Sequence, residues 1–235
     1  MKIRGERECR DCGSRWSYFE TGSVACPDCG SVRSTGVGDR ERHTDGVAEL
    51  DLADARSAAT RESLEAAADT AADACRDYVR TRGFVDAGEL RPLDDVYLAA
   101  QELVHAASLV RTRMTVDEVE ETYVLELLEG AESGERPDPD AVPRGMRAAR
   151  GLGAATAVRD YRDEIRTYLG PKRSEVASLL ETVGEHVTRI RAIDGDVPPE
   201  DGDGLIEAVR AIGEAVRTGE EEPLETATST LEDLR

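Results

Sequence analysis

Cys9-Arg10-Asp11-Cys12-Gly13 is followed, after thirteen residues between Cys12 and Cys26, by a second stretch of the same kind, Cys26-Pro27-Asp28-Cys29-Gly30. Two cysteines three positions apart place both sulfur atoms on one side of a tight turn. The glycine that follows permits a positive φ, at which backbone amides point toward sulfur. Four thiolates from two such turns can close a tetrahedral site around one metal ion, for which zinc is the default. The predicted ligands of one structural Zn²⁺ ion are Cys9, Cys12, Cys26 and Cys29.

Iron is the alternative occupant of this site. The two turns also resemble those of rubredoxin-type centres, and an iron ion held there would carry one electron. Similar tails occur on peroxide-reducing helical bundles that bind two irons through paired Glu-x-x-His motifs. This chain has one such motif, Glu102-Leu103-Val104-His105, and no second, because Val183 stands three residues before His186. A di-iron site is therefore not expected, and His186 is expected to be structural.

The residues around the two turns predict a small β structure. Residues 15–19 alternate between polar and apolar side chains and are rich in aromatic ones, which predicts a strand. Residues 24–25 return the chain to the second turn, and residues 31–35 predict another short strand. A three-stranded ribbon of this size is too small to bury a core without its metal. We expect Trp16 and Phe19 to cover the metal site rather than to stack on bases.

A change of pattern marks the end of this ribbon. Residues 36–46 have no period and contain three glycines, which predicts a linker with a solvated His43. We therefore predict two domains, a zinc ribbon with its linker at 1–45 and an acidic α-helical domain at 46–235.

Apolar residues recur every three to four positions from about residue 50, which predicts helices. The expected helices are at about 64–83, 93–107, 115–130, 144–169, 171–193, 204–218 and 222–234, with Pro171 in a first turn. Residues 131–143 predict a mobile loop, and Cys75 is expected to be a buried thiol. An approximate heptad seam comprises Val176, Leu179, Val183, Ile190 and Ile193. The predicted fold class is a small β zinc ribbon followed by an all-α helical bundle domain.

The charge is distributed unevenly along the chain. The net charge is −20, whereas residues 1–45 hold eight basic and eight acidic residues, so the whole excess lies in the helical part. Such a body should repel nucleic acid and anionic membranes. Lys2 and Lys172 are the only lysines, and this composition is typical of a halophilic archaeal protein in which acidity serves solvation at high salt.

Signatures of catalysis and of membrane insertion are missing from the sequence. We find no glycine-rich phosphate loop after a strand and no nucleophile near a histidine, and four cysteines leave no open position on zinc. Neither a signal peptide nor an apolar run of membrane-spanning length is present. We therefore predict a non-enzymatic cytoplasmic protein without a membrane partner, whose paired cysteines bind metal rather than form disulfides.

The segment from Cys9 to Cys29, continued to about Thr44, resembles the zinc ribbon at the start of the archaeal general transcription factor B. It is more similar still to short haloarchaeal zinc-ribbon proteins of that type. This resemblance covers about a fifth of the chain and implies zinc ligation by the four cysteines, together with a transcription-related docking role. In the general factor the ribbon docks on RNA polymerase and two cyclin-like repeats bind promoter DNA. The acidic helical part here has no duplicated half, so promoter binding is not expected.

We predict from these observations a zinc-binding protein-interaction protein that is associated with transcription. The first alternative is a rubredoxin-like Cys₄ iron electron carrier. The second is nucleic-acid binding through the ribbon alone. The residues that would support nucleic-acid binding are Arg10, Arg15, Arg33, Arg40, Arg42 and Trp16.

Overall fold

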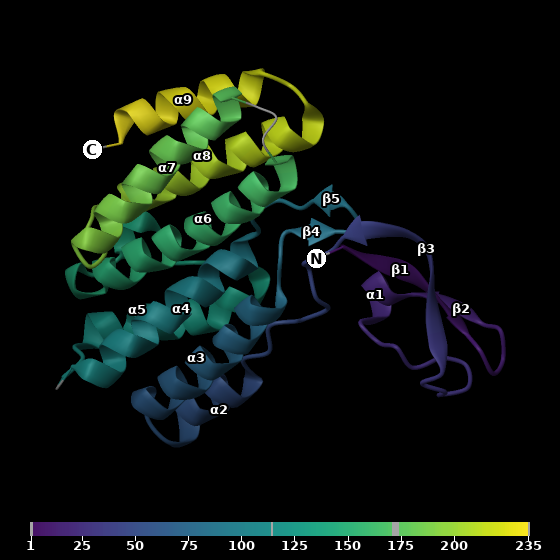
Figure 1. The fold of residues 1–235 in the computed structure, drawn as a ribbon. Helices are drawn as coiled ribbons and strands as arrows, with labels where there is room; N and C mark the ends of the chain where they lie inside the picture. The colour runs from purple at the N-terminus through teal and green to yellow at the C-terminus, as the bar shows by residue number, and fades with distance from the viewer. Residues whose placement is uncertain (1, 114, 171–173, 235) are drawn as a thin grey trace. The chain divides into compact units, whose positions relative to one another are not determined.

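The computed structural model describes residues 2–113, 115–170 and 174–234 (Figure 1). Contacts within the chain define two compact units. The first, Met1–Glu49 with Arg80–Arg91, is here called the ribbon unit, and the second, Leu50–Val79 with Pro92–Arg235, is called the helical unit. The predicted fold class is confirmed, because a small antiparallel sheet with the four cysteines precedes a predominantly helical body. The predicted domain boundary at residues 45 and 46 stays a prediction about independent folding.

Three antiparallel strands form the sheet of the ribbon unit, in the order β2-β1-β3 (Figure 1). They are β1 (Lys2–Cys9), β2 (Arg15–Ser17) and β3 (Ser34–Arg42). The β1–β3 register shifts between Arg4 and Glu6. A side chain at Gly5, between these residues, would collide with the ring of Phe19, so the glycine allows this ring to lie on the sheet.

The predicted strands of the ribbon were partly wrong. The N-terminal residues, for which no strand was predicted, form the central strand β1. The strand expected at 15–19 stops at Ser17, which caps the short helix α1 (Tyr18–Thr21) by accepting a hydrogen bond from Glu20 N–H. The strand expected at 31–35 begins at Ser34 and continues to Arg42, so most of the predicted linker is sheet. Pairing with β1 along its length compensates for the missing apolar alternation.

The prediction of a solvated linker histidine was also wrong. The ring of His43 lies on that of Phe19, with centroids 4.4 Å apart, and its Nδ1 is 3.4 Å from the Asp86 carboxylate. Asp86 belongs to a hairpin of two short strands, β4 (Val85–Asp86) and β5 (Glu89–Leu90), in a stretch expected to be helical or irregular. Thr44 N–H donates to the Val85 carbonyl at 2.8 Å. These contacts make the hairpin part of the ribbon unit.

The helical unit consists of helices, most of which are joined by short turns, with a longer connection of three 3₁₀ turns between α5 and α6 (Figure 1). The seven expected helices are present, and α2 is an additional one that was not predicted. Asp117 caps α5 and forms a capping box with Glu120. The expected first-turn position of Pro171 lies outside the described residues. The helices are α2 (Ala53–Arg61), α3 (Leu64–Thr81), α4 (Asp95–Thr112), α5 (Glu118–Gly130), α6 (Arg147–Leu169), α7 (Ser174–Ala192), α8 (Pro199–Thr218) and α9 (Glu222–Asp233).

Helix α6 is central to this unit, with α4 on one side and α7 and α8 on the other (Figure 1). Its buried face consists largely of alanine and glycine, which lets neighbouring helices approach closely. A Cβ at Gly153 would lie 2.8 Å from Cα of Glu102 on α4. Small residues on α6 therefore determine how near α4 comes.

Two expectations about the helical unit were wrong: one concerned the segment 131–143, and the other concerned the buried face of α7. Residues 131–143, predicted to be a mobile loop, include the 3₁₀ turns η1 (Ala131–Ser133) and η2 (Pro139–Ala141), and η3 (Arg144–Met146) follows. Glu132 in η1 accepts from Leu52 N–H and pairs with Arg56 at 3.0 Å. The buried seam of α7 differs from the predicted one, because Leu179 is half-buried and Ile193 is exposed. Its buried residues are Val176, Leu180, Val183, Val187 and Ile190.

Two further findings concern single predictions. Cys75 is fully buried on α3, as expected, and burial raises the pKa of its thiol to about 12. Among the described residues, no helix combines the length and apolar character needed to cross a membrane.

Candidate metal centre

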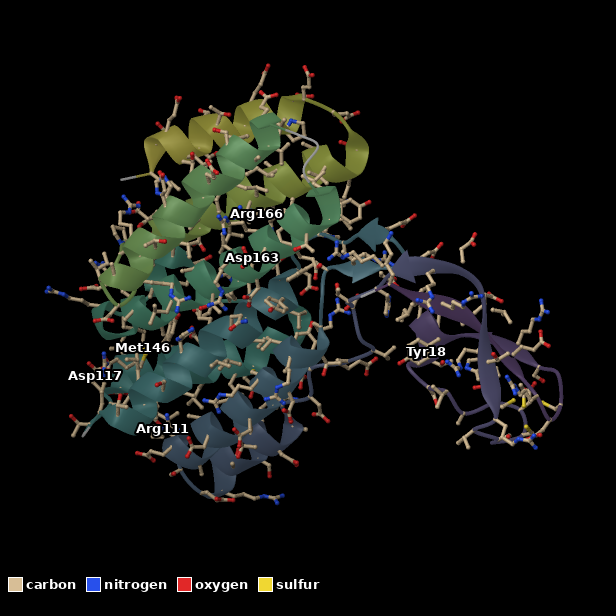
Figure 2. The ribbon with its side chains drawn as sticks, viewed as in Figure 1. Tyr18, Arg111, Asp117, Met146, Asp163 and Arg166 are labelled. Atoms are coloured by element: carbon tan, nitrogen blue, oxygen red, sulfur yellow. The ribbon has the colours of Figure 1, made fainter. Side chains whose placement is uncertain are left out.

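The structure brings all four predicted cysteines together in the ribbon unit. Cys9 ends β1, Cys12 lies in the turn before β2, and Cys26 and Cys29 lie in the turn before β3. Their sulfur atoms all lie within 4.8 Å of one another. Figure 2 shows these sulfur atoms gathered at one end of the ribbon. Residues twenty positions apart in the sequence thus meet in one cluster.

The two Cys-x-x-Cys-Gly turns have the same backbone structure. Gly13 N–H donates to the Cys9 carbonyl at 3.1 Å, and Gly30 N–H donates to the Cys26 carbonyl at 2.9 Å. Both glycines adopt the left-handed conformation, with φ of 78° and 72°. Side chains other than glycine rarely adopt this conformation. The glycines therefore have the role expected from the sequence.

The sulfur–sulfur distances fit a metal ion better than disulfides. Sγ of Cys9 lies 3.6 Å from Sγ of Cys29, and Sγ of Cys12 lies 3.6 Å from Sγ of Cys26. A disulfide requires about 2.0 Å, whereas a tetrahedral site with metal–sulfur bonds of about 2.3 Å separates its sulfurs by about 3.8 Å. The donor set and its spacing fit one tetrahedral thiolate-bound ion, and they do not distinguish zinc from iron.

The thiols differ in how readily they lose a proton. Hydrogen bonds from the side chain and the backbone of Ser14 lower the pKa of Cys12 to about 6. At Cys29 the Ser31 N–H favours the thiolate, but the neighbouring Cys12 and Cys9 sulfurs oppose it and raise the pKa to about 12. Four thiolates at these distances repel one another, and a divalent cation removes this repulsion. The electrostatics of the cluster thus favour a bound cation.

Trp16 covers the buried side of the cluster. Its ring is only 7 % exposed and packs with Cys9 and Cys26, and its Nε1–H donates to the Ser23 carbonyl at 3.0 Å. This confirms the covering role expected of Trp16, whereas Phe19, of which the same was expected, packs against Gly5 and His43 instead. A buried indole ring has no free face on which a base could stack.

Asp11 connects the two turns and was not singled out from the sequence. Its carboxylate accepts a hydrogen bond from the Ser31 hydroxyl at 2.5 Å and pairs with Arg33 at 2.9 Å. Asp11 lies between the first two cysteines, while Ser31 and Arg33 follow the fourth. The position of Asp11 between two ligand cysteines is the only signal in the sequence that could have indicated its contact with Ser31 and Arg33.

The Glu-x-x-His motif of α4 does not form part of a metal site. Glu102 is fully buried and binds Arg150 at 3.0 Å, while Nε2 of His105 lies 3.2 Å from the Thr156 hydroxyl. Across the described ranges, the four cysteines form the only close group of three or more potential histidine, cysteine or carboxylate ligands. His186 is half-buried and burial lowers its pKa, but its buried Nδ1 has no hydrogen-bond partner among the described residues, so it is not the fully hydrogen-bonded histidine that was expected.

A buried ionic network in the helical unit was missed by sequence reasoning. Glu102 of α4 binds Arg150 of α6 and Arg136, and it accepts a hydrogen bond from the Tyr123 hydroxyl of α5. Asp203 of α8 also pairs with Arg150, at 3.0 Å. Two arginines thus neutralise two carboxylates in the interior. The sequence indicated only indirectly that Glu102 is buried, because the neighbouring positions of its helix are apolar.

These observations define a class of protein in which a small Cys₄ ribbon is joined to an all-helical body. The chain belongs to a family of unknown function, DUF7117, whose model matches residues 1–231. Neither a curated protein nor a solved structure matches the chain.

Proposed function

We propose that this protein is a zinc-binding, non-enzymatic interaction protein in which one structural Zn²⁺ ion holds the ribbon together. The observation that supports this proposal is the group of four thiols with all sulfur atoms within 4.8 Å of one another. Four cysteines fill the coordination shell of zinc and leave no position for water or substrate. The metal therefore serves folding rather than catalysis, and a cytoplasmic location would keep its ligands reduced.

The surface near the second cysteine pair supports a docking role. Val32 is 71 % exposed and Val24 is 45 % exposed. The carbonyls of both valines accept hydrogen bonds from Ser34, at 3.0 Å from its N–H and at 2.6 Å from its hydroxyl. The backbones of the two valines therefore lie close together at the metal-held end of the ribbon. Exposed apolar side chains on a rigid surface are typical of a protein contact.

The resemblance of the ribbon to that of the general transcription factor B directs the search for this partner. We infer a transcription-associated partner, with RNA polymerase as the one to be tested first. Nucleic-acid binding through the ribbon is less well supported. Arg15 pairs with Glu8 at 2.6 Å and Arg33 pairs with Asp11 at 2.9 Å, which reduces the positive charge available for phosphate.

Metal analysis of the full chain tests the zinc proposal. The protein is purified from its native host without oxygen and without added metal, because metal supply during expression can select the wrong ion. We expect one zinc per chain and no visible colour, loss of zinc in Cys12→Ser, and retention in the matched Cys75→Ala. One iron per chain with a thiolate charge-transfer band would overturn zinc and support the rubredoxin-like electron carrier.

Co-purification with RNA polymerase tests the docking surface. We expect Val32→Asp to keep its zinc and to lose the polymerase, because a carboxylate in an apolar contact must be desolvated. The matched control is Val119→Asp, which changes a valine that is 63 % exposed on α5 of the helical unit. Polymerase retained by Val32→Asp, or lost equally by both variants, would reject this surface.

A further inference from the structure

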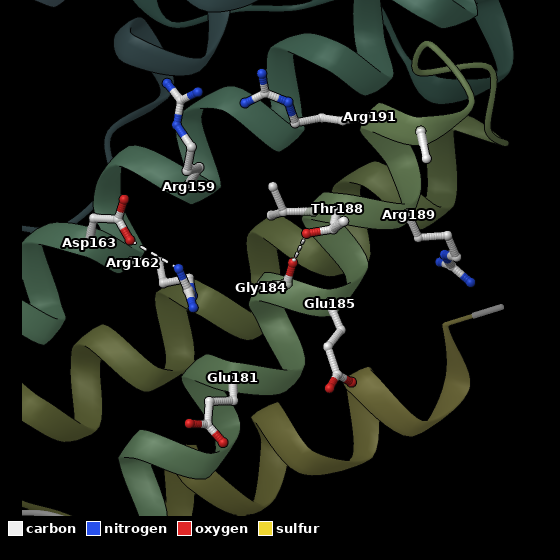
Figure 3. Close-up of a pocket in the computed structure, with 11 residues that line it drawn as sticks. Arg159, Arg162, Asp163, Glu181, Gly184, Glu185, Thr188, Arg189 and Arg191 are labelled. Atoms are coloured by element: carbon white, nitrogen blue, oxygen red, sulfur yellow. Dashed lines mark hydrogen bonds and ion pairs between the residues drawn. The ribbon is translucent and has the colours of Figure 1, made fainter.

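A groove of about 920 Å³ lies between α6 and α7 of the helical unit (Figure 3). Its volume is within the range of small-molecule sites. Figure 3 shows Arg159 of α6 and Arg191 of α7 at one end, with Glu181 and Glu185 toward the other. The groove therefore has a cationic end, in a protein with a net charge of −20.

Arg162, in the middle of the groove, has a structural role. It donates from Nε to the Leu180 carbonyl of α7 at 2.5 Å and pairs with Asp163 at 3.0 Å. Gly184 makes room for it, because a Cβ there would lie 2.6 Å from the guanidinium group. Arg162 thus holds α6 against α7, and its remaining Nη2 group lies against Gly184. Its side chain is 15 % exposed, whereas that of Arg159 is 39 % exposed, so Arg159 is the better placed of the two to reach a ligand.

The two arginines at the cationic end keep free hydrogen-bond donors. Arg159 uses Nε and Nη2 to bind Asp160, at 3.0 Å and 2.7 Å, which leaves Nη1 without a partner among the described residues. Within the same residues, Arg191 makes neither a hydrogen bond nor an ion pair. The other oxygen of Asp160 accepts from the Tyr97 hydroxyl at 3.1 Å, so this carboxylate is not free to neutralise Arg191.

The two arginines of the cationic end also act on the pKa of His105, a residue of α4 that does not line the groove. Burial lowers its pKa, and Arg191, Arg159 and Arg76 lower it further. Arg191 of α7 and Arg159 of α6 line the groove, whereas Arg76 of α3 does not and pairs with Asp73 at 2.9 Å. Asp160 offsets much of the charge of Arg159, so Arg191 supplies the uncompensated positive charge at this end, which attracts an anion from solution.

We propose that the cationic end of this groove binds the phosphate group of a small phosphorylated molecule, with Arg191 and Arg159 as the donors. A guanidinium group offers two parallel N–H donors that match phosphate oxygens. Glu181 and Glu185 at the other end favour a ligand whose remaining part is neutral or cationic. Long polyanions such as nucleic acid are disfavoured by the acidic body around the groove.

Titration calorimetry of the full chain with inorganic pyrophosphate, at constant ionic strength, tests the proposal. We expect one saturable site per chain and at least about tenfold weaker binding in Arg191→Ala, because a charge-assisted hydrogen bond is lost. Arg191→Lys, which keeps the charge but lacks the paired donors, should bind with intermediate affinity. The matched control is Arg217→Ala, which also removes an arginine from the last turn of a helix, α8, and should bind as tightly as the parent protein.

A second titration with citrate distinguishes phosphate recognition from general anion binding. We expect citrate to bind at least about tenfold more weakly than pyrophosphate, because one terminal phosphate group offers three oxygens that two guanidinium groups can share, whereas one carboxylate offers only two. Equal affinity for citrate would overturn the assignment to phosphate. Absence of a saturable pyrophosphate site, or equal losses in Arg191→Ala and Arg217→Ala, would overturn the site itself. Circular dichroism of each variant verifies that the helices are intact.

Discussion

His105 occupies a position where protonation is unfavourable. Its side chain is half-buried between α4 and α6, where Nε2 lies 3.2 Å from the Thr156 hydroxyl. Burial lowers its pKa from the ordinary value of 6.5, and three arginines lower it further. The unfolded chain therefore takes up a proton at a higher pH than the folded chain does.

This difference predicts how stability depends on pH. The contribution of neutral His105 is fully present above about pH 6.5 and is lost as the pH falls toward its lower folded pKa. We expect the free energy of unfolding to fall from pH 7 to pH 5.5, by at most about 1.4 kcal/mol per pH unit for this one group. His105→Gln should reduce that slope in urea titrations followed by circular dichroism. An unchanged slope would contradict the argument.

Single functional residues could be predicted from the sequence only where chemically distinctive side chains occur at a characteristic spacing. The four cysteines could be identified from two short motifs, and the structure gathers their sulfur atoms. Glu102 could not be interpreted in this way, because its partners Arg150, Arg136 and Tyr123 come from distant parts of the chain. A single acidic side chain on a helix does not indicate which arginine will reach it. Pairing of this kind depends on how the helices pack.

The network around Glu102 joins separate elements of the helical unit. Arg150 of α6 pairs with Glu102 of α4 and with Asp203 of α8, and its side chain is 3 % exposed. Arg136 brings the segment between η1 and η2 to the same two carboxylates. Removing one member leaves its partners charged in the interior. The network therefore fixes which faces of α4, α6 and α8 meet.

We expect Arg150→Ala to lower the free energy of unfolding by about 3–5 kcal/mol, because Glu102 would lose a buried partner. Equilibrium urea denaturation followed at 222 nm measures this loss. The double variant Glu102→Gln with Arg150→Met should recover part of it, since no uncompensated charge remains. Arg210→Ala, which removes a surface pair with Asp95 and one hydrogen bond to the Leu93 carbonyl, should cost no more than about 2 kcal/mol. Equal losses for Arg150→Ala and Arg210→Ala would show that the network adds little.

Helices with a strong apolar periodicity could be predicted from the sequence, whereas strands that are stabilised by pairing with another strand could not. Helices α3 to α9 follow apolar residues repeated every three to four positions. Strands β1 and β3 are largely polar, with few buried positions, so no alternation indicated them. Their stability comes from hydrogen bonds to each other. Helix α2 was missed because it is short and mostly polar.

At the level of the whole molecule, the ribbon unit is expected to depend on its metal. The ribbon has a very small buried cluster, formed by Cys9, Trp16 and Cys26, so metal binding supplies most of its folding free energy. The larger apolar core lies in the helical unit. Loss of metal should therefore affect the two units differently. The acidity assigned to solvation at high salt stays a prediction.

We expect Cys26→Ser, or removal of metal by a chelator, to unfold the ribbon while helix content changes little. Trp16 is the only tryptophan of the chain and lies against Cys9 and Cys26, so its emission should shift to longer wavelength as water reaches it. Circular dichroism at 222 nm should stay close to the parent value. Cys75→Ala is the control and should change neither emission nor metal content. A parallel loss of helix signal would mean that the two units unfold together.

The ribbon unit is assembled from two separated stretches of chain, and this restricts how the gene could have been recombined. Gly46 N–H donates to the Thr81 carbonyl at 3.0 Å, so both stretches must be inherited together for the unit to be complete. Residues 50–79, which lie between the two stretches, belong to the helical unit. A crossover near residue 46 would divide the ribbon unit, and one after residue 91 would remove α2 and most of α3 from the helical unit. No single breakpoint exchanges either unit intact, so the two units are expected to pass between genomes as one piece.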